Sequence, residues 1–355
     1  MKNYISILFC FCLLNLSAKD NIPNNDTNTN ANIQIIGGGC MDPSSEAELD
    51  IGNVRTTILG GGDMWWNLTD ARYEIPKNEG VHSLFAGSLW IGGMDNQNNL
   101  KMAAMTYRQT GSDFYPGPLN ADSNSNEFGT TTSEDCDTYN QHWVISKSDV
   151  EAYVTYINCE NDPNCDANTT FPDYEVPEAI TDWPASHFDF DGTNEYLAPF
   201  IDVDGNEDYN PESGDYPGYD LTAEGDCAVN DYLFGDQSIW WVFNDAGNYH
   251  GETGGTPIGL EIQAQAFAYK TNDALSDMTF YSYKIINRSS ETLNETYFGQ
   301  WVDPDVGNYQ DDYVGCDVAL GLGYCYNGDD NDEGAQGVSA GYGFNPPAIG
   351  VDFFR

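Results

Sequence analysis

Residues 258–269 have the sequence IGLEIQAQAFAY, in which apolar and polar side chains alternate. Successive side chains of a β-strand point to opposite faces, so Leu260 and Ile262 would share one face and Glu261 and Gln263 the other. A strand with one apolar and one polar face is typical of an antiparallel sheet that covers a core on one side. The stretch therefore predicts a long strand of such a sheet.

Other runs repeat this pattern between turn residues. Residues 278–287 alternate in the same way, and residues 53–59 form a β-branched run that ends at three glycines. Residues 149–157 instead place apolar side chains at helical spacing behind Ser146 or Ser148 as a cap, and are the best helix candidate. Together these patterns predict a mainly β protein of antiparallel β-sandwich (Ig-like) modules, with long turn-rich, ion-stabilised loops and at most one or two short helices.

The chain is strongly acidic. Its 355 residues, enough for about two domains, include 12 Lys and Arg against 57 Asp and Glu, for a formal net charge of −45. Nucleic-acid binding relies on Lys and Arg at the phosphates, so this charge predicts no nucleic-acid partner and favours cations instead. Aromatic residues make up 14% of the chain, which predicts a packed core rather than disorder.

The N-terminus predicts export. Lys2 precedes an apolar run that is too short to span a bilayer, and residues 1–18 are therefore expected to be a signal peptide. No later run is long and apolar enough for a membrane helix, so no membrane insertion is expected after signal removal. We expect the mature protein to be secreted or held on the outer cell surface.

The rest of the chain divides into four expected regions. Residues 19–50 are rich in Asn, Thr and Ser and predict a disordered linker. Residues 51–158 predict an N-terminal β-rich region with one helix near 148–157, and residues 159–235 an irregular acidic loop region. Residues 236–355 predict a C-terminal β-sandwich region.

An exported chain can oxidise its cysteines. Of the nine cysteines, Cys10 and Cys12 lie within the signal segment. Two pairs of the remaining cysteines are close in sequence and are expected to form local disulfides. A third, longer pairing is a guess, and one cysteine near the N-terminus is left without a partner. The predicted disulfides join Cys159 to Cys165, Cys316 to Cys325 and Cys136 to Cys227, and leave Cys40 unpaired.

Residues 202–208, DVDGNED, place a side-chain oxygen at every second position of a tight loop. Calcium gathers several such oxygens, but an EF-hand would have glycine at the sixth position and Glu at the twelfth, where this loop has Glu207 and Ser213. A calcium loop in a β or irregular setting fits better, and a plain acidic turn is the alternative. The predicted ligands are Asp202, Asp204, Asn206 and Asp208, with Glu212 or Asp215 completing the shell.

Two further acidic groups are candidates for a calcium ion. Asp189 and Asp191 lie in a stretch with similar alternation and could share the first ion or bind a second. The other group follows a predicted strand, and its closely spaced carboxylates would repel one another without a cation. A turn in which these side chains bond the backbone is the alternative. The predicted ligands of this group are Asp303, Asp305, Asp311 and Asp312.

Four longer motifs are similar to large exported surface proteins of Bacteroidota that use type IX secretion. They are GGDMWW (61–66), SLWIGG (88–93), GDQSIWWVFND (235–245) and GQWVDPDVG (299–307), and the similarity runs with gaps from about residue 52 onward. The resemblance implies a location rather than an activity. Family members usually carry a C-terminal sorting domain for the export machinery, which this chain lacks, so we expect it to be truncated. The family's acidic loop often has glycine in place of Glu207.

No motif indicates catalysis. The histidines lack metal-site spacing, and the GxSxG motif at 337–341 is followed by Pro346 and Pro347, which exclude the helix that a nucleophile elbow needs. Any two of the 57 acids could be nominated as a glycosidase pair, so the sequence leaves an enzyme open without supporting one. We therefore expect a non-catalytic structural or adhesive protein that binds a glycan or another cell-surface partner. The alternative is a polysaccharide-active enzyme or carbohydrate-binding module with the aromatic residues as a platform, although core packing explains those residues more simply.

Overall fold

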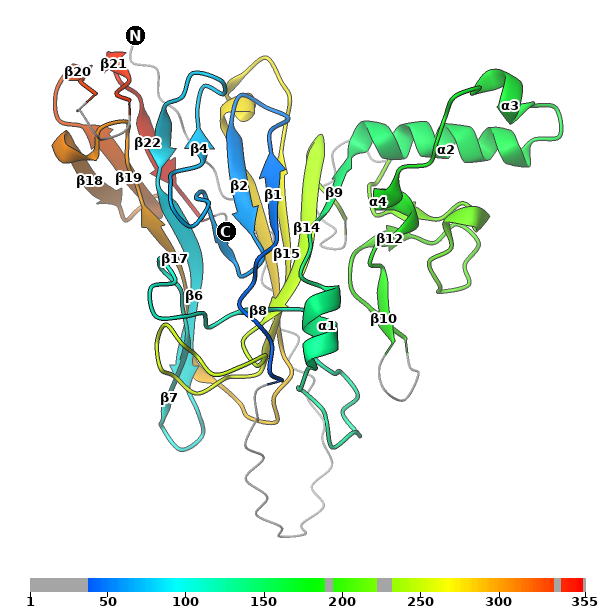
Figure 1. Ribbon diagram of the computed structural model, residues 1–355, viewed down its shortest axis with the longest axis horizontal. Helices are drawn as coiled ribbons and strands as arrows, with labels where there is room; N and C mark the ends of the chain where they lie inside the picture. Colours follow the sequence, from blue (N-terminus) through cyan, green and yellow to red (C-terminus); the bar gives the residue numbers. More distant parts are fainter. Residues whose placement is uncertain (1–37, 189–193, 222–231, 335–339, 354–355) are drawn as a thin grey trace.

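The computed structural model describes residues 38–188, 194–221, 232–334 and 340–353 (Figure 1). These residues form antiparallel sheets, the largest with eight strands. The strands of this larger sheet are β1 (Glu46–Leu49), β2 (Arg55–Leu59), β3 (Asp63–Met64), β4 (Tyr73–Glu74), β5 (His82–Leu84), β6 (Ala86–Met94), β7 (Leu100–Ala103) and β17 (Asn294–Asp303). Their order is β17-β6-β3-β2-β4-β5, with β1 paired to β2 and β7 paired to β6.

The second sheet has five strands and contains the stretch that predicted the fold. Its strands are β8 (Tyr115–Pro116), β9 (Trp143–Ser146), β14 (Gln237–Asn244), β15 (Leu260–Ala268) and β16 (Phe280–Asn287). The order is β16-β15-β14-β8, and β9 pairs with β14. Strand β15 is central, because it pairs with β14 on one side and with β16 on the other.

The two sheets pack face to face around one hydrophobic core. Ile262 and Ala264 of β15 join it from the five-stranded sheet, and Ile58 of β2 joins it from the eight-stranded sheet. The indole Nε1 of Trp65 donates a hydrogen bond of 2.7 Å to the hydroxyl of Tyr281 on β16, which links the two sheets inside the core. The antiparallel β-sandwich predicted from the alternating strands is confirmed, and its Ig-like form stays a prediction. Strands from both predicted β-rich regions build this single core.

Helix α2 (Lys147–Asn161) confirms the helix predicted near 148–157. The side chain of Ser146 caps it by accepting a hydrogen bond from the backbone N–H of Asp149. The described residues contain three further α-helices, whereas at most one or two helices were expected in all. These short helices are α1 (Ser133–Thr138), α3 (Ala167–Thr170) and α4 (Glu178–Thr181).

The predicted loop region of residues 159–235 contains short elements and has a core of its own. Val150 and Tyr153 of α2 pack with Trp183 and with Trp240 and Val242 of β14. The latter two side chains point away from the main core, so this layer covers the outer face of the five-stranded sheet, with α2 and α4 beside β14 in Figure 1. Its strand pairs are β10 (Ser186–Phe188) with β11 (Asn194–Tyr196), and β12 (Phe200–Ile201) with β13 (Tyr216–Pro217).

A smaller three-stranded sheet follows β17. It consists of β18 (Asp312–Asp317), β19 (Leu322–Asn327) and β22 (Ala348–Val351), with β19 in the middle. A further short pair joins β20 (Asn331–Asp332) to β21 (Gly343–Phe344). Cys325 and Ile349 reach from this sheet into the main core.

The prediction of a disordered linker over 19–50 is wrong from residue 38 onward. Strand β1 pairs with β2 along its whole length, and Leu49 is buried in the main core. Cys40 is also buried, and its backbone N–H donates to the carbonyl of Gly247. The polar composition of this segment did not indicate that Leu49 and Cys40 contact residues distant in sequence. Residues 19–37, and the signal segment before them, lie outside the described residues.

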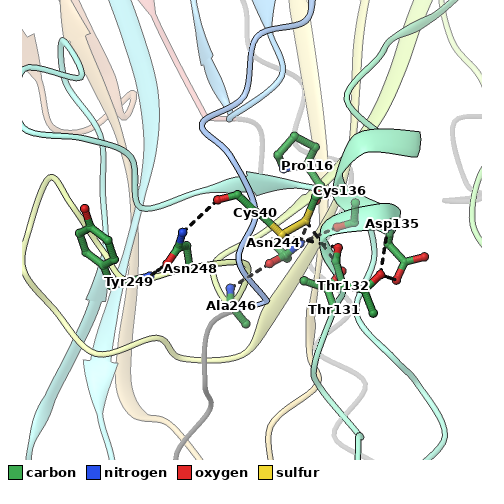
Figure 2. Close-up of a disulfide and its surroundings, with 11 residues drawn as sticks. Cys40, Pro116, Thr131, Thr132, Asp135, Cys136, Asn244, Ala246, Asn248 and Tyr249 are labelled. Carbon is green, nitrogen blue, oxygen red and sulfur yellow. Dashed lines mark hydrogen bonds between the residues drawn. A yellow bond between two sulfur atoms is a disulfide. The ribbon is translucent and has the colours of Figure 1, made fainter.

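Two of the three predicted disulfides are wrong, and so is the prediction that Cys40 is unpaired. Cys136 bonds to Cys40 rather than to Cys227, and Cys40 is therefore not unpaired (Figure 2). The two partners are 96 residues apart with their Cα atoms 5.7 Å from one another, and Cys227 lies outside the described residues. Helix α1 presents Cys136, and Asn248 donates to the carbonyl of Cys40, so the fold brings the two cysteines together.

The predicted bond between Cys316 and Cys325 is absent, and both cysteines are free. Cys316 lies opposite Gly323 on the neighbouring strand, and Cys325 lies opposite Val314. The two cysteines are therefore diagonal neighbours, whose Cα atoms in an antiparallel pair are about 7–8 Å apart, beyond the reach of most disulfides. The predicted bond between Cys159 and Cys165 is present at the end of α2.

Candidate functional site

The acidic loop of residues 202–208 begins directly after β12. The carboxylate of Asp202 accepts hydrogen bonds from the backbone N–H groups of Gly205 at 2.7 Å, Asn206 at 3.3 Å and Glu207 at 2.8 Å. A short side chain that bonds the backbone two to five residues ahead folds the chain back on itself. Asp202 therefore determines the shape of the loop.

Asp215 closes the loop from its other end. Its side chain is buried, with 0% exposure, directly before β13. One oxygen accepts from the backbone N–H of Val203 at 2.8 Å and the other from that of Asn210, also at 2.8 Å. A buried carboxylate is costly unless it is hydrogen-bonded, and these two bonds satisfy that requirement.

Three carboxylates converge at this point. Asp202, Asp204 and Asp215 each offer one oxygen, and these oxygens all lie within 4.8 Å of one another. Oxygens that share a calcium ion lie 2.3–2.6 Å from it, and hence within about 5 Å of one another. Backbone N–H groups, foremost that of Glu207, hold the pKa of Asp202 below its ordinary value, although burial opposes them. The hard, ionised oxygens thus fit a calcium ion.

The other predicted ligands of the first site have different surroundings. The amide of Asn206 donates to Asp204 at 2.9 Å, and its oxygen accepts from the backbone N–H of Asp208 at 2.7 Å. Asp208 and Glu212 are exposed and do not belong to the three-carboxylate group. The two acids of the upstream stretch, Asp189 and Asp191, lie outside the described residues.

Glu207 has an unusual backbone conformation. Its φ is +69°, in the left-handed region where a side chain is strained and glycine is not. Its carbonyl accepts a hydrogen bond of 3.0 Å from the hydroxyl of Tyr196. The loop therefore demands a glycine-like conformation at Glu207.

The second predicted acidic group does not converge in the same way. In the part of the chain that the structure describes, Asp202, Asp204 and Asp215 are the only trio of such groups at ligand spacing. Asp303 accepts from the hydroxyl of Tyr107 at 2.6 Å. Burial and the carboxylates of Asp303 and Asp312 raise the pKa of Asp305 to about 7.

Asp312 lies beside these carboxylates but is held separately. One of its oxygens accepts from the backbone N–H of Val306 at 2.8 Å. Burial, with smaller contributions from nearby acids, raises its pKa to about 6. Asp311 is partly exposed, with one buried oxygen that lacks a hydrogen-bond partner among the described residues. The raised pKa values mean that Asp305 and Asp312 take up a proton more readily than ordinary carboxyls, which would relieve part of the repulsion from which a cation was predicted.

A buried charged group escaped prediction from the sequence. The two ring nitrogens of His250 lie 2.8 Å from the carbonyl oxygens of Met102 and Asp245. Carbonyl oxygens only accept hydrogen bonds, so both nitrogens carry a proton and the ring is a cation. The carboxylates of Asp113 and Asp245 lie 3.7 and 3.5 Å from these nitrogens. This ion group links the loops beside β14, and all three of its side chains are buried.

A pocket on the outer face of the five-stranded sheet was also missed. It lies beside the acidic loop, because Asp202 and Glu207 contribute to its wall. Its floor comes from the polar side of the alternating strand β15, namely Gln263 and Gln265. The sequence predicted that these residues face away from the core, but only the layer of residues 196–202 turns that face into a pocket.

Searches against protein-family models, curated proteins and solved structures found no match to this chain. The described residues include no helix with the length and apolar character needed to cross a bilayer. The motif GxSxG at 337–341 lies largely outside the described residues, Ser339 included.

Proposed function

We propose that this chain is an exported, non-catalytic structural or adhesive protein of the cell surface, with calcium bound by the loop of residues 202–215. The observation that carries the proposal is the convergence of Asp202, Asp204 and Asp215, which come from both ends of that loop. Calcium takes six to eight oxygens, so backbone carbonyls and water would complete the shell.

The position of the three carboxylates gives the ion a structural role. Asp202 directly follows β12 and Asp215 directly precedes β13, and these two strands pair with each other. An ion shared by the two side chains would therefore hold both ends of the loop on one short strand pair. A ligand that binds only the folded chain stabilises it, so calcium would fix a layer that has few long elements of its own.

Export is supported by the cysteines and by the resemblance. Disulfides such as Cys40–Cys136 and Cys159–Cys165 form and persist in oxidising compartments outside the cytoplasm. The motifs shared with type IX secretion proteins point to the same location, with a sorting domain as the element that the export machinery would recognise. A protein held there meets glycans and other cell-surface molecules as partners.

Calcium titration tests the metal site directly. Isothermal titration of the chelator-treated protein should show saturable calcium binding, and Asp204→Ala should abolish it, because this exposed side chain has its main role in the three-carboxylate group. The matched control is Asp330→Ala, which removes an exposed carboxylate from another loop. Equal calcium binding by the wild type and Asp204→Ala would reject the site.

A further inference from the structure

A pocket of about 450 Å³ lies on the outer face of the five-stranded sheet, between β14–β16 and residues 196–202. This volume is within the range of sites that hold small molecules, about 300–1,000 Å³. The pocket is adjacent to the acidic loop and shares Asp202 and Glu207 with it, while the rest of its lining comes from other segments. Its floor is formed by regular strands, which hold side chains more rigidly than loops do.

The strand register places the polar side chains of the floor in two rows. Gln265 lies opposite Trp240 of β14 and Ser282 of β16. Gln263 lies opposite Lys284 in the next row of the same face. Ala264, which lies between the two glutamines, belongs to the main core, so both amides point to the outer side.

The amide nitrogen of Gln265 has no hydrogen-bond partner among the described residues. Its residue is only 6% exposed, and its Nε2 makes no hydrogen bond within the described residues. A buried donor without a partner is costly and uncommon in native proteins. The neighbouring Gln263 differs, because its Nε2 donates to Glu261 at 2.9 Å. Gln265 lines the pocket but its Nε2 is covered, so a turn of the amide toward the pocket would let an acceptor oxygen on a ligand satisfy it.

Lys284 supplies a second donor on the same floor. Its side chain is exposed and forms no ion pair with any residue that the structure describes, although the chain has 57 acids. Ser282 adds a hydroxyl beside it. The floor therefore presents donors to whatever enters, and favours a ligand rich in oxygen acceptors.

Aromatic rings form much of the remaining wall. Trp240, Phe200, Tyr196 and Phe234 all line the pocket. A pyranose ring matches this composition, since its C–H face packs on aromatic rings while its hydroxyl and ring oxygens accept hydrogen bonds at its rim. A purely apolar ligand would leave the amide of Gln265 unsatisfied.

We propose that this pocket binds a saccharide, with a hydroxyl or carboxylate oxygen on Gln265 Nε2 and Lys284 and a pyranose face on the aromatic wall. This inference rests on the proposed function in one respect, since it names the ligand class through which the protein would adhere. The proposed donors Gln265 and Lys284 lie outside the three-carboxylate group, although Asp202 of that group also lines the pocket wall, so glycan binding is measured with and without calcium.

The test is isothermal titration of the intact protein with two kinds of defined oligosaccharide. Cellohexaose and mannohexaose represent neutral glycans, and hexagalacturonate represents glycans with carboxylates. At least one should bind saturably, and Gln265→Met should weaken that binding by about tenfold or more, as expected for a lost buried hydrogen bond. Lys284→Met should weaken hexagalacturonate by about tenfold and neutral glycans by less than about threefold.

Two controls separate loss of the site from loss of the fold. Lys270→Met removes another exposed lysine, outside the pocket lining, and should leave binding unchanged. Gln265→Met should keep or raise the melting temperature, because it removes a donor without a partner. Failure of all three glycans to bind at about 10 mM, a concentration far above useful affinities, would overturn the proposal. The proposal would also be overturned if Gln265→Met and Lys284→Met both bound the glycans with wild-type affinity.

The calcium and glycan results are independent. Each titration is run once in calcium and once in EGTA. Glycan binding in EGTA by a protein that binds no calcium would retain the pocket and reject the metal site. Calcium binding without glycan binding would retain the metal site and reject the pocket.

Discussion

The carboxylate of Asp215 accepts a hydrogen bond of 2.8 Å from the backbone N–H of Val203, the residue that follows Asp202 in the acidic loop. One buried side chain thus fixes the start of the loop and also offers an oxygen to the three-carboxylate group. Asp204 offers an oxygen as well, but it is exposed, and it accepts hydrogen bonds from the backbone N–H and the side-chain amide of Asn206. The two acids should therefore respond differently to substitution.

Asp215→Ala should destabilise the protein with or without calcium. It leaves the N–H groups of Val203 and Asn210 without their acceptor, at a cost of about 2 kcal/mol in the free energy of unfolding. Asp204→Ala should cost less than about 0.5 kcal/mol in EGTA, as a surface substitution does, and should lose only the stabilisation that calcium adds. Urea unfolding in calcium and in EGTA measures both effects. A large loss for Asp204→Ala in EGTA would contradict this division of roles.

Glu207→Gly should stabilise the loop slightly. The left-handed conformation of Glu207 costs about 1 kcal/mol for a residue with a side chain, while glycine adds disorder to the unfolded chain, so the net gain should be about 0.5 kcal/mol. The matched control is Glu212→Gly, in the 3-10 turn Pro211–Ser213, which should lose about 0.5 kcal/mol. Urea unfolding compares the two, and an equal loss in both would show that φ is not the cause.

His250→Gln should destabilise the protein most at acidic pH. Burial works to lower the pKa of His250, but the hydrogen bond and charge of Asp245 and the charge of Asp113 outweigh it and raise the pKa. The stabilisation from the protonated ring is therefore fully present below pH 6.5, the ordinary pKa, and is lost as the pH rises through the higher folded value.

The variant should lose about 3 kcal/mol at pH 6, because it leaves two buried carboxylates without their cation. The difference between wild type and variant should shrink toward pH 9. Urea unfolding of both proteins across this range measures it, and the comparison cancels the titration of other groups. A difference that is constant with pH would refute the cationic state of His250.

Asp305→Asn should leave the stability of the protein unchanged at acidic pH and raise it at alkaline pH. The folded pKa of about 7 lies above the ordinary value, so wild type binds this proton more tightly when folded and loses stability as the pH rises through 7. The asparagine side chain of the variant is uncharged, so its burial does not depend on pH. The variant should match wild type near pH 4 and be more stable by about 2 kcal/mol at pH 8, after allowance for solvent screening. Thermal melts at both pH values check this, with Asp330→Asn as an exposed control.

The strands could be predicted because their pattern is local. In residues 258–269 the alternation assigns Ile262 to the core and Gln263 to the outer face, and the structure places both accordingly. Helix α2 was predictable for the same reason, since its cap Ser146 lies next to it in the sequence. The proximity of Asp215 to the acidic loop could be predicted because it lies only 12 residues from Val203, within one loop, and whether it binds calcium stays a prediction.

What the sequence could not reveal depends on contacts between distant segments. The Cys40–Cys136 bond spans 96 residues, and its partners lie together because α1 packs beside β8 and the Cys40 segment bonds to Gly247. The His250 group draws one carboxylate from residue 113 and the other from residue 245. The pocket around Gln265 needs a separate layer to cover a strand face. Composition and periodicity contain no information about such pairings.

Thermal unfolding with and without calcium tests the proposed metal site most directly. Calcium at about 100 times its dissociation constant would stabilise the folded chain by about 2.7 kcal/mol. For a chain of this size that corresponds to a rise in melting temperature of about 4 °C relative to EGTA. We predict this rise for wild type and Asp330→Ala, and none for Asp204→Ala. Identical melting of wild type in calcium and in EGTA, together with purified protein that contains no calcium, would contradict the proposal.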